Sequence, residues 1–338
     1  MQGNGEDHAN NVLLPATARA AGFASPFDRA EWFDLLAAHG FAGQGRDDAH
    51  GDCGAVSAWL PLRLEKPGHF SGLTCWYSFG IRPLYDGPAH PGERGGALSD
   101  LFARLKRRAA RLTLYPVPEV DGLPGDLAIA LRKAGWWVQA TPAGDRHWLD
   151  LAGMDHDAWW ESRPGALRST VKRKAKKGVV DIALFTRFDA DAWAAYEAIY
   201  AASWKPEEGD PALLRAFAEA ESARGTFRMG LARIEGRPVA AQYWTVEDGT
   251  AFIHKLAHVE DSLKASPGTL LSAALFRHVI ETDGVARVDF GTGNDAYKRD
   301  WMNRHDPLWR IEAFNPARIA AWGPACKAFA RSLIRKDI

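Results

Sequence analysis

Three apolar segments joined by tight turns, in the second half of the chain, constrain the fold more than any other feature. Residues 226–234, 239–246 and 251–258 are each long enough to form one strand. The connections between them are Glu235-Gly236-Arg237-Pro238 and Glu247-Asp248-Gly249, and both are typical turn sequences. This spacing predicts an antiparallel meander of three strands.

Helices and further strands surround the meander in one specific order. Two helices with apolar faces precede it, and a helix, a strand, a short helix, a strand and a C-terminal helix follow it. The expected elements around the meander are residues 158–162, 165–177, 179–188, 190–203, 211–224, 268–282, 285–291, 295–303, 309–314 and 319–335. This order of helices and strands indicates an α+β layer structure.

The first half predicts a less complete copy of the same order. Its expected elements are a helix at 28–39, strands at 55–64 and 70–79, a loop rich in Pro and Gly at 83–97, a helix at 100–110 capped by Ser99, a strand at 112–117, a helix at 126–134 and strands at 136–141 and 147–151. We therefore predict three regions: a polar lead-in at 1–27, a degenerate N-terminal lobe at 28–150 and a catalytic C-terminal domain at 151–338.

Composition excludes several classes of function. The 42 basic and 42 acidic residues balance, so the chain as a whole is not an electrostatic binder of DNA. The three cysteines are scattered along the sequence and predict neither a disulfide framework nor a zinc site: Cys53, Cys75 and Cys326. No group of His, Cys, Asp and Glu residues has the sequence spacing of metal ligands. Residues 1–11 lack an apolar signal segment, and no apolar run could span a membrane, so we expect a cytoplasmic protein.

The segment from Lys264 to Leu271 joins the third meander strand to an apolar helix. Free backbone N–H groups and the helix dipole make such a helix start an anion site. The candidate residues for binding a phosphate-bearing donor are Lys264, Ser266, Gly268, Thr269 and Leu270, with Lys298 from a later segment. The alternative is an ordinary helix start with a proline in its first turn.

The strand after this helix ends in polar and small residues. Asp289 is followed by Phe290-Gly291-Thr292-Gly293, and Tyr297 and Lys298 open a short helix. Functional residues often lie on loops at the ends of such elements. Asp289 could equally cap the helix, or pair with Arg287 or Lys298.

His254 and Lys255 interrupt the apolar third strand of the meander. A period of two places them on opposite faces of the sheet, so at most one of them points to a given cleft. A buried lysine needs a partner, and Asp289 on the expected neighbouring strand is the obvious candidate. A structural ion pair is the alternative to a catalytic role.

The helix from Arg163 to Lys177 carries seven positive charges and no acid. It fits a solvated helix face, or contact with donor phosphates, tRNA or anionic lipid headgroups. The chain also has 14 tryptophans, which either fill cores or line an apolar groove or a lipid-contacting surface. A basic helix beside many tryptophans favours a peripheral position on the inner membrane.

The second half resembles the GNAT superfamily branch of acetyltransferases of the cellulose-biosynthesis-protein type, which is related to the Fem peptidyltransferases. The resemblance spans residues 145–315, and residues 28–145 resemble a first GNAT-like lobe more faintly. It rests on these pieces, in this order: Ser162-Arg163-Pro164 with the basic helix, Ser203-Trp204-Lys205, Ala240-Ala241-Gln242-Tyr243-Trp244, His254-Lys255-Leu256-Ala257, Ser266-Pro267-Gly268-Thr269-Leu270-Leu271, Asp289-Phe290-Gly291 and Tyr297-Lys298-Arg299-Asp300-Trp301.

The resemblance implies an α+β GNAT fold and direct transfer of an acyl group to an amine from acyl-CoA, a co-substrate rather than a permanent cofactor. Asp289 or His254 would take the proton of the amine. Backbone N–H groups around residues 256–258 would stabilise the thioester oxygen. Tyr297 would protonate the departing thiolate, and two lysines would hold Asp289 or a phosphate: Lys255 and Lys298.

The resemblance leaves the acceptor open. Lys264 and a single Gly268 stand where the commoner GNAT signature has a Gln or Arg and paired glycines, which argues against a plain acetyl donor. Bacterial ceramide synthases also resemble this branch, which implies a long-chain acyl donor and a sphingoid base as the lipid-like acceptor. The alternatives are a Fem-like transferase that uses aminoacyl-tRNA and a non-catalytic GNAT-fold partner in envelope polysaccharide assembly.

Overall fold

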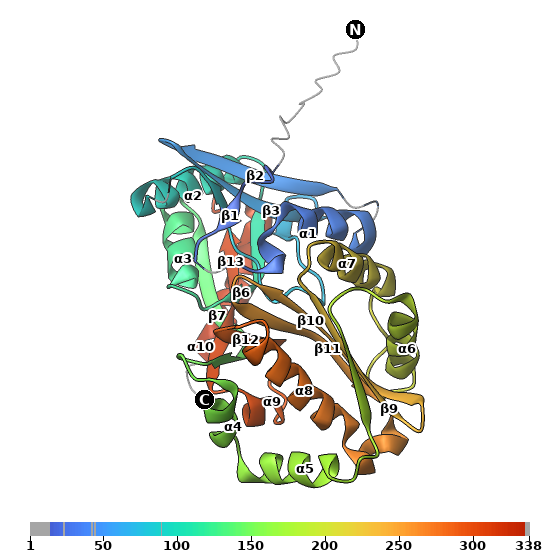
Figure 1. Cartoon of the computed structure of the whole chain (residues 1–338). Coiled ribbons are helices and arrows are strands. Elements are labelled where there is room, and N and C mark those ends of the chain that lie inside the picture. The colour runs from blue at the N-terminus through green and yellow to red at the C-terminus, as the bar shows by residue number, and fades with distance from the viewer. Residues whose placement is uncertain (1–13, 23, 42, 44, 89, 335–338) are drawn as a thin grey trace. The chain divides into compact units, whose positions relative to one another are not determined.

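The computed structural model describes residues 14–334 except 23, 42, 44 and 89, and these residues form two units (Figure 1). One unit is residues 144–306, and the other joins the described residues up to 143 with those from 307 onwards. The catalytic domain expected at 151–338 differs from the first of these units by including the residues from 307. The expected lead-in at 1–27 lies partly outside the described residues.

A mixed sheet forms the centre of the 144–306 unit. Its strands follow the order β7, β12, β11, β10, β9, β8, and all neighbours are antiparallel except β11 and β12. Their bounds are β7 (Trp137–Asp150), β8 (Asp181–Phe185), β9 (Phe227–Ile234), β10 (Arg237–Glu247), β11 (Thr250–His258) and β12 (Arg287–Thr292), with β7 contributing from residue 144. Strands β9, β10 and β11 confirm the predicted meander.

Helices cover both faces of this meander, with α8 on one side and α6 and α7 on the other (Figure 1). The helices of the unit are α4 (His156–Glu161), α5 (Gly165–Ala175), α6 (Ala190–Ala201), α7 (Pro211–Ala223), α8 (Pro267–Glu281) and α9 (Lys298–Trp301). Side chains along β10 alternate accordingly. Tyr243 packs against Trp193 of α6 and Phe217 of α7, whereas Trp244 packs against Phe276 of α8.

One extra residue in β11 interrupts the alternation. The pairing of β10 with β11 shifts register after Tyr243 and leaves His254 without a cross-strand partner, which makes a β-bulge. The His254 ring stacks on Tyr243 with 5.0 Å between centroids, and Lys255 Nζ lies 5.2 Å from the Tyr200 ring of α6. Both side chains therefore lie on the α6 side, and the prediction that they face opposite ways is wrong.

Strands β11 and β12 part soon after they meet. Their parallel pairing ends with Phe252 opposite Asp289. Beyond that pair β11 continues to His258 and β12 to Thr292, with no further ladder between them in the part of the chain that the structure describes. The 3-10 helix η3 (Glu260–Ala265) then leads from β11 to α8. The sheet is thus open between two strand ends, at the connection that leads to α8.

The strands of the other unit follow the order β1, β5, β3, β4, β6, β13, with β2 paired to β3. Its core gathers side chains of the strands and of two helices, α2 and α3. The bounds are β1 (Arg19–Ala20), β2 (Arg46–Cys53), β3 (Val56–Lys66), β4 (His69–Gly72), β5 (Leu84–Asp86), β6 (Arg111–Pro118), β13 (Arg304–Phe314), α1 (Ala30–Leu35), α2 (Pro91–Lys106), α3 (Leu123–Lys133) and α10 (Trp322–Ile334). None of the described helices has the length and apolar character needed to cross a membrane.

Helix α2 begins at Pro91, well before the expected start at residue 100, and one of its glycines, Gly96, packs closely against β2. A Cβ on Gly51 of β2 would lie 2.1 Å from the Leu101 backbone nitrogen, and one on Gly96 would lie 2.4 Å from Cys53 Sγ. Helix and strand therefore approach as closely as glycine allows. Proline at the first helical position is compatible with this start.

Gly51→Ala should destabilise the protein by about 1–3 kcal/mol, the usual cost of forcing an extra carbon into a packed contact. The new Cβ meets the backbone of α2, which cannot turn away as a side chain can. Thermal denaturation followed by circular dichroism measures the effect. Gly92→Ala in the first turn of α2 is the control, since a Cβ there has nothing within 4 Å. Equal melting temperatures for the two variants would contradict the proposed contact.

Candidate functional site

The N-terminus of α8 is open at its first turn. Ser266 occupies the cap position in a left-handed conformation, with φ of 55°, and its own side chain forms no capping hydrogen bond. A Cβ on Gly268 would meet only His258 Nδ1, at 3.6 Å. The first-turn N–H groups and the helix dipole therefore face space that an anion can enter.

Gln242 of β10 fixes the position of this helix start. The side chain is fully buried, and its Nε2 donates to Ser272 Oγ at 2.7 Å and to the Gly268 carbonyl at 3.2 Å. Its Oε1 accepts from Trp244 Nε1 at 3.0 Å. The Gln242 amide thus connects the meander to the first turns of α8, which is why a buried amide is stable at this point.

The candidate donor-binding residues of this segment have different surroundings. Lys264 is exposed in η3, and its carbonyl accepts a hydrogen bond from Lys174 Nζ of α5. Leu270 is buried, so its side chain packs in the interior rather than facing the open helix start. Three residues are half-buried at the helix start itself: Ser266, Gly268 and Thr269.

Asp289 is almost completely buried in β12, at 1% exposure. One carboxylate oxygen accepts from Arg146 of β7, at 2.9 Å from Nε, and the other accepts from the Gly291 N–H at 2.9 Å. The sequence pointed to Lys255, Arg287 or Lys298 as the partner of Asp289. The structure places a guanidinium beside Asp289 because β7 runs antiparallel next to β12, a pairing that sequence spacing does not reveal.

Glu208, in the polar segment between α6 and α7, is the counter-ion of Lys255. Lys255 Nζ lies 2.6 Å from Glu208 Oε1, and Glu208 Oε2 accepts from the Tyr196 hydroxyl at 2.8 Å. The Lys255 side chain is only 7% exposed, so this is a buried ion pair with a further hydrogen bond on the carboxylate. His254 Nε2 lies 2.8 Å from Thr245 Oγ1 on the same face.

Tyr297 and Lys298 differ in how their polar groups are engaged. Lys298 Nζ is buried and donates to the Thr292 carbonyl at 2.6 Å, so it holds the segment between β12 and α9 together. Burial lowers the pKa of Lys298, against the opposite effect of Asp295. Tyr297 is partly exposed, and burial together with the charge of Asp295 raises the pKa of its hydroxyl. That hydroxyl therefore stays protonated and is available to donate a hydrogen bond.

Lys205 is a further candidate, which lies in the Ser203-Trp204-Lys205 segment and has no role that a sequence pattern indicates. Burial and then the charge of Lys255 lower the pKa of Lys205 to about 8, against the opposite effects of Asp295 and Glu208. The residue lines a cavity of about 760 Å³ together with aromatic and acidic side chains: Trp193, Tyr196, Tyr200, Glu207 and Glu208. A lysine that titrates near neutral pH in a cavity is a candidate for chemistry.

The basic helix α5 presents most of its charge to solvent. Arg163, which precedes it, is buried and donates to the Met302 carbonyl at 3.1 Å, so it belongs to the interior. Lys174 is half-buried against η3, as described above. The other cationic residues of the run are exposed: Arg168, Lys172, Arg173, Lys176 and Lys177.

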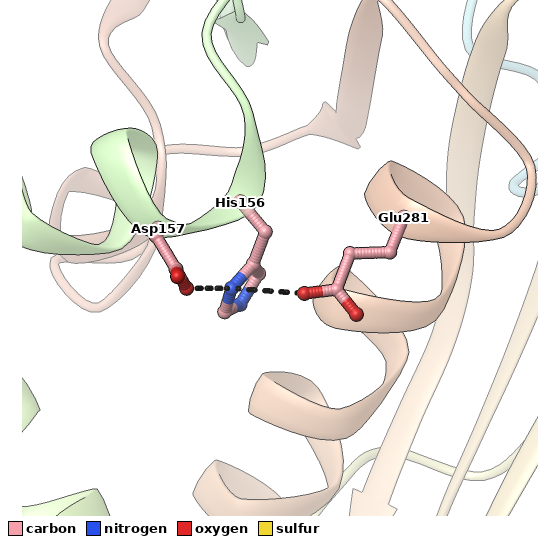
Figure 2. A group of neighbouring side chains, drawn as sticks. All are labelled: His156, Asp157 and Glu281. Carbon is pink, nitrogen blue, oxygen red and sulfur yellow. Dashed lines mark hydrogen bonds and ion pairs between the residues drawn. The ribbon is translucent and has the colours of Figure 1, made fainter.

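Three side chains in the described residues come within reach of a single metal ion, as Figure 2 shows: His156, Asp157 and Glu281. His156 Nδ1 lies 3.2 Å from the Asp157 carboxylate and 3.6 Å from that of Glu281. Sequence spacing does not reveal this group, because Glu281 ends α8. At 1.5 Å per residue, that end is about 20 Å from the helix start, so the group is separate from the site above. It links the start of α4 to the end of α8.

Apart from Arg146, His156, Asp157 and Arg163, the side chains described above lie within one stretch of sequence that has a recognised counterpart. Residues 165–299 match the family model described as the acetyltransferase (GNAT) domain. The 144–306 unit has a GNAT-type fold. The match includes the open start of α8, both parting strands, Lys205 and every candidate site residue from His254 to Lys298.

Solved structures share this fold over most of the chain. The C-terminal domain of a candidate lysylphosphatidylglycerol synthetase from Agrobacterium fabrum has a TM-score of 0.58 at 12% identity, over 90% of this chain and 96% of that one. FemX has a TM-score of 0.58 at 11% identity, over 84% and 96%. L-PGS from Bacillus licheniformis has a TM-score of 0.54 at 11% identity, over 90% and 95%. No curated protein sequence matches the chain. The expected α+β GNAT-type fold is confirmed.

Asp289→Asn should destabilise the protein by about 3–5 kcal/mol, because it leaves the buried Arg146 guanidinium beside a neutral amide. The double variant Arg146→Met with Asp289→Asn should recover most of that loss, since it removes the unpaired charge. Chemical denaturation of the wild type and both variants measures this. A single variant as stable as the wild type would show that the pair does not hold β7 and β12 together.

Proposed function

We propose that the 144–306 unit transfers an acyl group from an acyl-CoA thioester directly to a primary amine. The observation that carries this proposal is the early parting of β11 from β12 beside the open N-terminus of α8. A thioester donor needs both features: an anion site for its pyrophosphate and an unpaired strand edge along which its amide-containing arm can extend.

The donor pyrophosphate is proposed to bind the first turn of α8. Ser266 and Thr269 can donate hydroxyl hydrogen bonds there, and Gly268 leaves room for the phosphate. Lys264 is exposed beside this turn and is long enough to reach a phosphate oxygen. The buried Lys298 is better placed to hold the segment after β12 than to contact the donor.

The chemistry needs a base, donors for the thioester oxygen and a group that stabilises the departing thiolate. Asp289 and His254 remain the sequence-based candidates for the base, and backbone N–H groups around residues 256–258 for the oxygen. Tyr297 is proposed to donate a hydrogen bond to the thiolate, a role that its raised pKa supports. Lys255 is proposed to orient Glu208 rather than Asp289, as their 2.6 Å contact supports.

The acceptor is proposed to be an amine with an apolar body. Support comes from the cavity of about 760 Å³, which combines aromatic rings with carboxylates and thus suits an ammonium group attached to hydrocarbon. A long-chain sphingoid base, which would yield a ceramide-type lipid, is one member of this class. The exposed cations of α5 support presentation of such an acceptor at an anionic membrane surface.

A Fem-like transferase that draws on aminoacyl-tRNA is the second candidate. Fold similarity to FemX supports it, and so does the exposed charge of α5, which would suit a phosphate backbone. If tRNA is the donor carrier, binding should weaken steeply with salt, and charge-neutralising substitutions in α5 should reduce the slope. Filter binding of tRNA at several salt concentrations tests this, and binding that does not change with salt would remove the tRNA candidate.

The assay that tests the main proposal supplies palmitoyl-CoA or acetyl-CoA, with and without sphinganine, and follows free thiol together with product mass. Thiol release from palmitoyl-CoA that depends on sphinganine and yields an N-acyl product supports lipid N-acylation. Release from acetyl-CoA alone moves the acceptor search to small amines or sugars. No release from either donor contradicts use of these acyl-CoA donors and favours tRNA, or a non-catalytic GNAT-fold role in polysaccharide assembly.

Gly268→Ala should raise the donor KM roughly tenfold, the change expected when about 1.4 kcal/mol of donor binding is lost. The added Cβ has room in the folded protein but projects at the proposed pyrophosphate position. Steady-state kinetics with varied donor measures the effect. The control is Gly323→Ala in the first turn of α10, where a Cβ also has space and precedes no proposed ligand. An unchanged donor KM for Gly268→Ala would place the pyrophosphate elsewhere.

A further inference from the structure

Two lysines lie close to one buried carboxylate in the segment between α6 and α7. Glu208 pairs with Lys255 through Oε1 and with the Tyr196 hydroxyl through Oε2. Lys205 is close enough for Glu208 and Lys255 to affect its charge state. Within the described part of the chain its ammonium group forms no hydrogen bond or ion pair. Lys255 therefore takes the strong counter-ion, and Lys205 has none of its own.

The surroundings of Lys205 favour its neutral form. Burial is the largest effect and the positive charge of Lys255 is the next, and together they lower the pKa of Lys205 from its ordinary value near 10.4 to about 8. The charged and titratable groups that face it come from every neighbouring segment: Tyr200 of α6, Glu207 and Glu208, Lys255 and His258 of β11, Asp295, and Lys298 of α9. With a pKa of about 8, roughly one Lys205 side chain in ten is a neutral amine with a free lone pair at pH 7.

The position of Lys205 connects the two halves of the proposed reaction. On one side it lines the aromatic and acidic cavity under α6. On the other side its charge lowers the pKa of His258, together with burial of that ring. His258 ends β11 and lies beside Gly268, at the open start of α8. Lys205 therefore lines the space proposed for the acceptor and is near enough to His258, beside the proposed donor site, for their charges to interact.

We infer that Lys205 is the catalytic base that converts the acceptor ammonium into a nucleophilic amine. This inference rests on the proposed amine N-acyltransferase function. Neutral Lys205 Nζ takes one proton from the ammonium and later releases it to solvent. The amine nitrogen then forms a bond to the thioester carbonyl carbon, and the C–S bond breaks. The electron pair leaves with sulfur, and the second nitrogen proton passes to the thiolate. The products are an amide and a free thiol.

The two sequence-based candidates are less suited to this step. Both carboxylate oxygens of Asp289 are engaged, one by Arg146 and one by the Gly291 N–H, and the group is buried in the sheet. The His254 ring is stacked between neighbours, and its Nε2 is engaged by Thr245. Lys205 lines the cavity and can reach a bound amine without breaking such contacts.

The first test is the pH dependence of kcat/KM for the acceptor in wild type, Lys205→Met and Lys205→Arg. Wild-type activity should rise tenfold per pH unit below about 8 and then level, because the neutral lysine is the active form. Both variants should lose about 10²–10⁴-fold at pH 7. Their activity should keep rising above pH 8, as the free acceptor amine becomes more abundant. Lys66→Met, exposed in the other unit, is the control.

Three outcomes of this test are distinguishable. A Lys205→Arg protein with wild-type activity would overturn the inference, because arginine keeps the charge but accepts no proton at these pH values. A Lys205→Met protein with the wild-type pH profile would overturn it as well. In both cases the proposed transferase function would stand. Absence of transfer by the wild type with every acyl-CoA and amine pair would instead overturn the proposed function.

A second measurement does not depend on the folding of a Lys205→Met protein. Reductive ¹³C-methylation of the wild type gives one NMR signal per lysine, and the Lys205 signal is the one absent from Lys205→Arg. Its titration midpoint should lie near 8. A midpoint above 10 would mean that the amine is protonated at working pH, and that result would also overturn the inference.

Discussion

The short parallel pairing of β11 with β12 is the constraint on which the rest of the candidate site depends. A longer ladder would occupy the backbone groups of residues 253–258 and close the sheet, and no ligand could then lie along that edge. Because the strands part at Phe252, the connection after β11 can turn back and start α8 at the opening. The buried Asp289 and Arg146 hold β12 to β7 at the same level, so β12 stays fixed on its other side while it leaves β11.

The two faces of the meander carry different chemistry. On the α8 face, Gln242 and Trp244 support the helix start that is proposed to receive the donor. On the α6 face, the bulge at His254 places two consecutive polar side chains on one side of the sheet, and the second, Lys255, pairs with Glu208, which lines the cavity together with Lys205. The sheet thus separates the helix start that is proposed to bind phosphate from the cavity that is proposed to bind an amine. Its open edge is the place where groups from the two environments can meet.

Sequence alone predicted the parts of the fold that depend on local pattern. The meander could be predicted because turn sequences separate its apolar segments at strand length. The helix and strand that follow it could be predicted because Gly284 separates two apolar runs. The bulge could not be read, because one inserted residue changes the face of Lys255 without changing composition. The early start of α2 was hidden because Gly96, which contacts β2, looks the same in the sequence as a glycine in a loop.

The candidate site was predicted where one segment is sufficient and missed where two distant segments must meet. The open helix start at Ser266 and Gly268 is a local feature and was found. Two buried ion pairs join separate segments of the chain, so the partners could not be assigned from sequence spacing: Arg146 with Asp289, and Glu208 with Lys255. Lys205 differs from other lysines only through its burial and its neighbours.

The tryptophans fall into two groups. Trp159, Trp193 and Trp244 fill the interior, while Trp204 is 63% exposed next to Lys205.

The division of the chain at residues 143 and 307 sets the order in which the protein can be completed during synthesis. The 144–306 unit is one uninterrupted stretch, whereas the other unit needs residues on both sides of it. Domains generally fold as their chain leaves the ribosome. The 144–306 unit therefore has its whole sequence available while the other unit still lacks the β13 residues that pair with β6. The polypeptide is translated from its N-terminus, yet the unit encoded in its middle is the first that can finish folding.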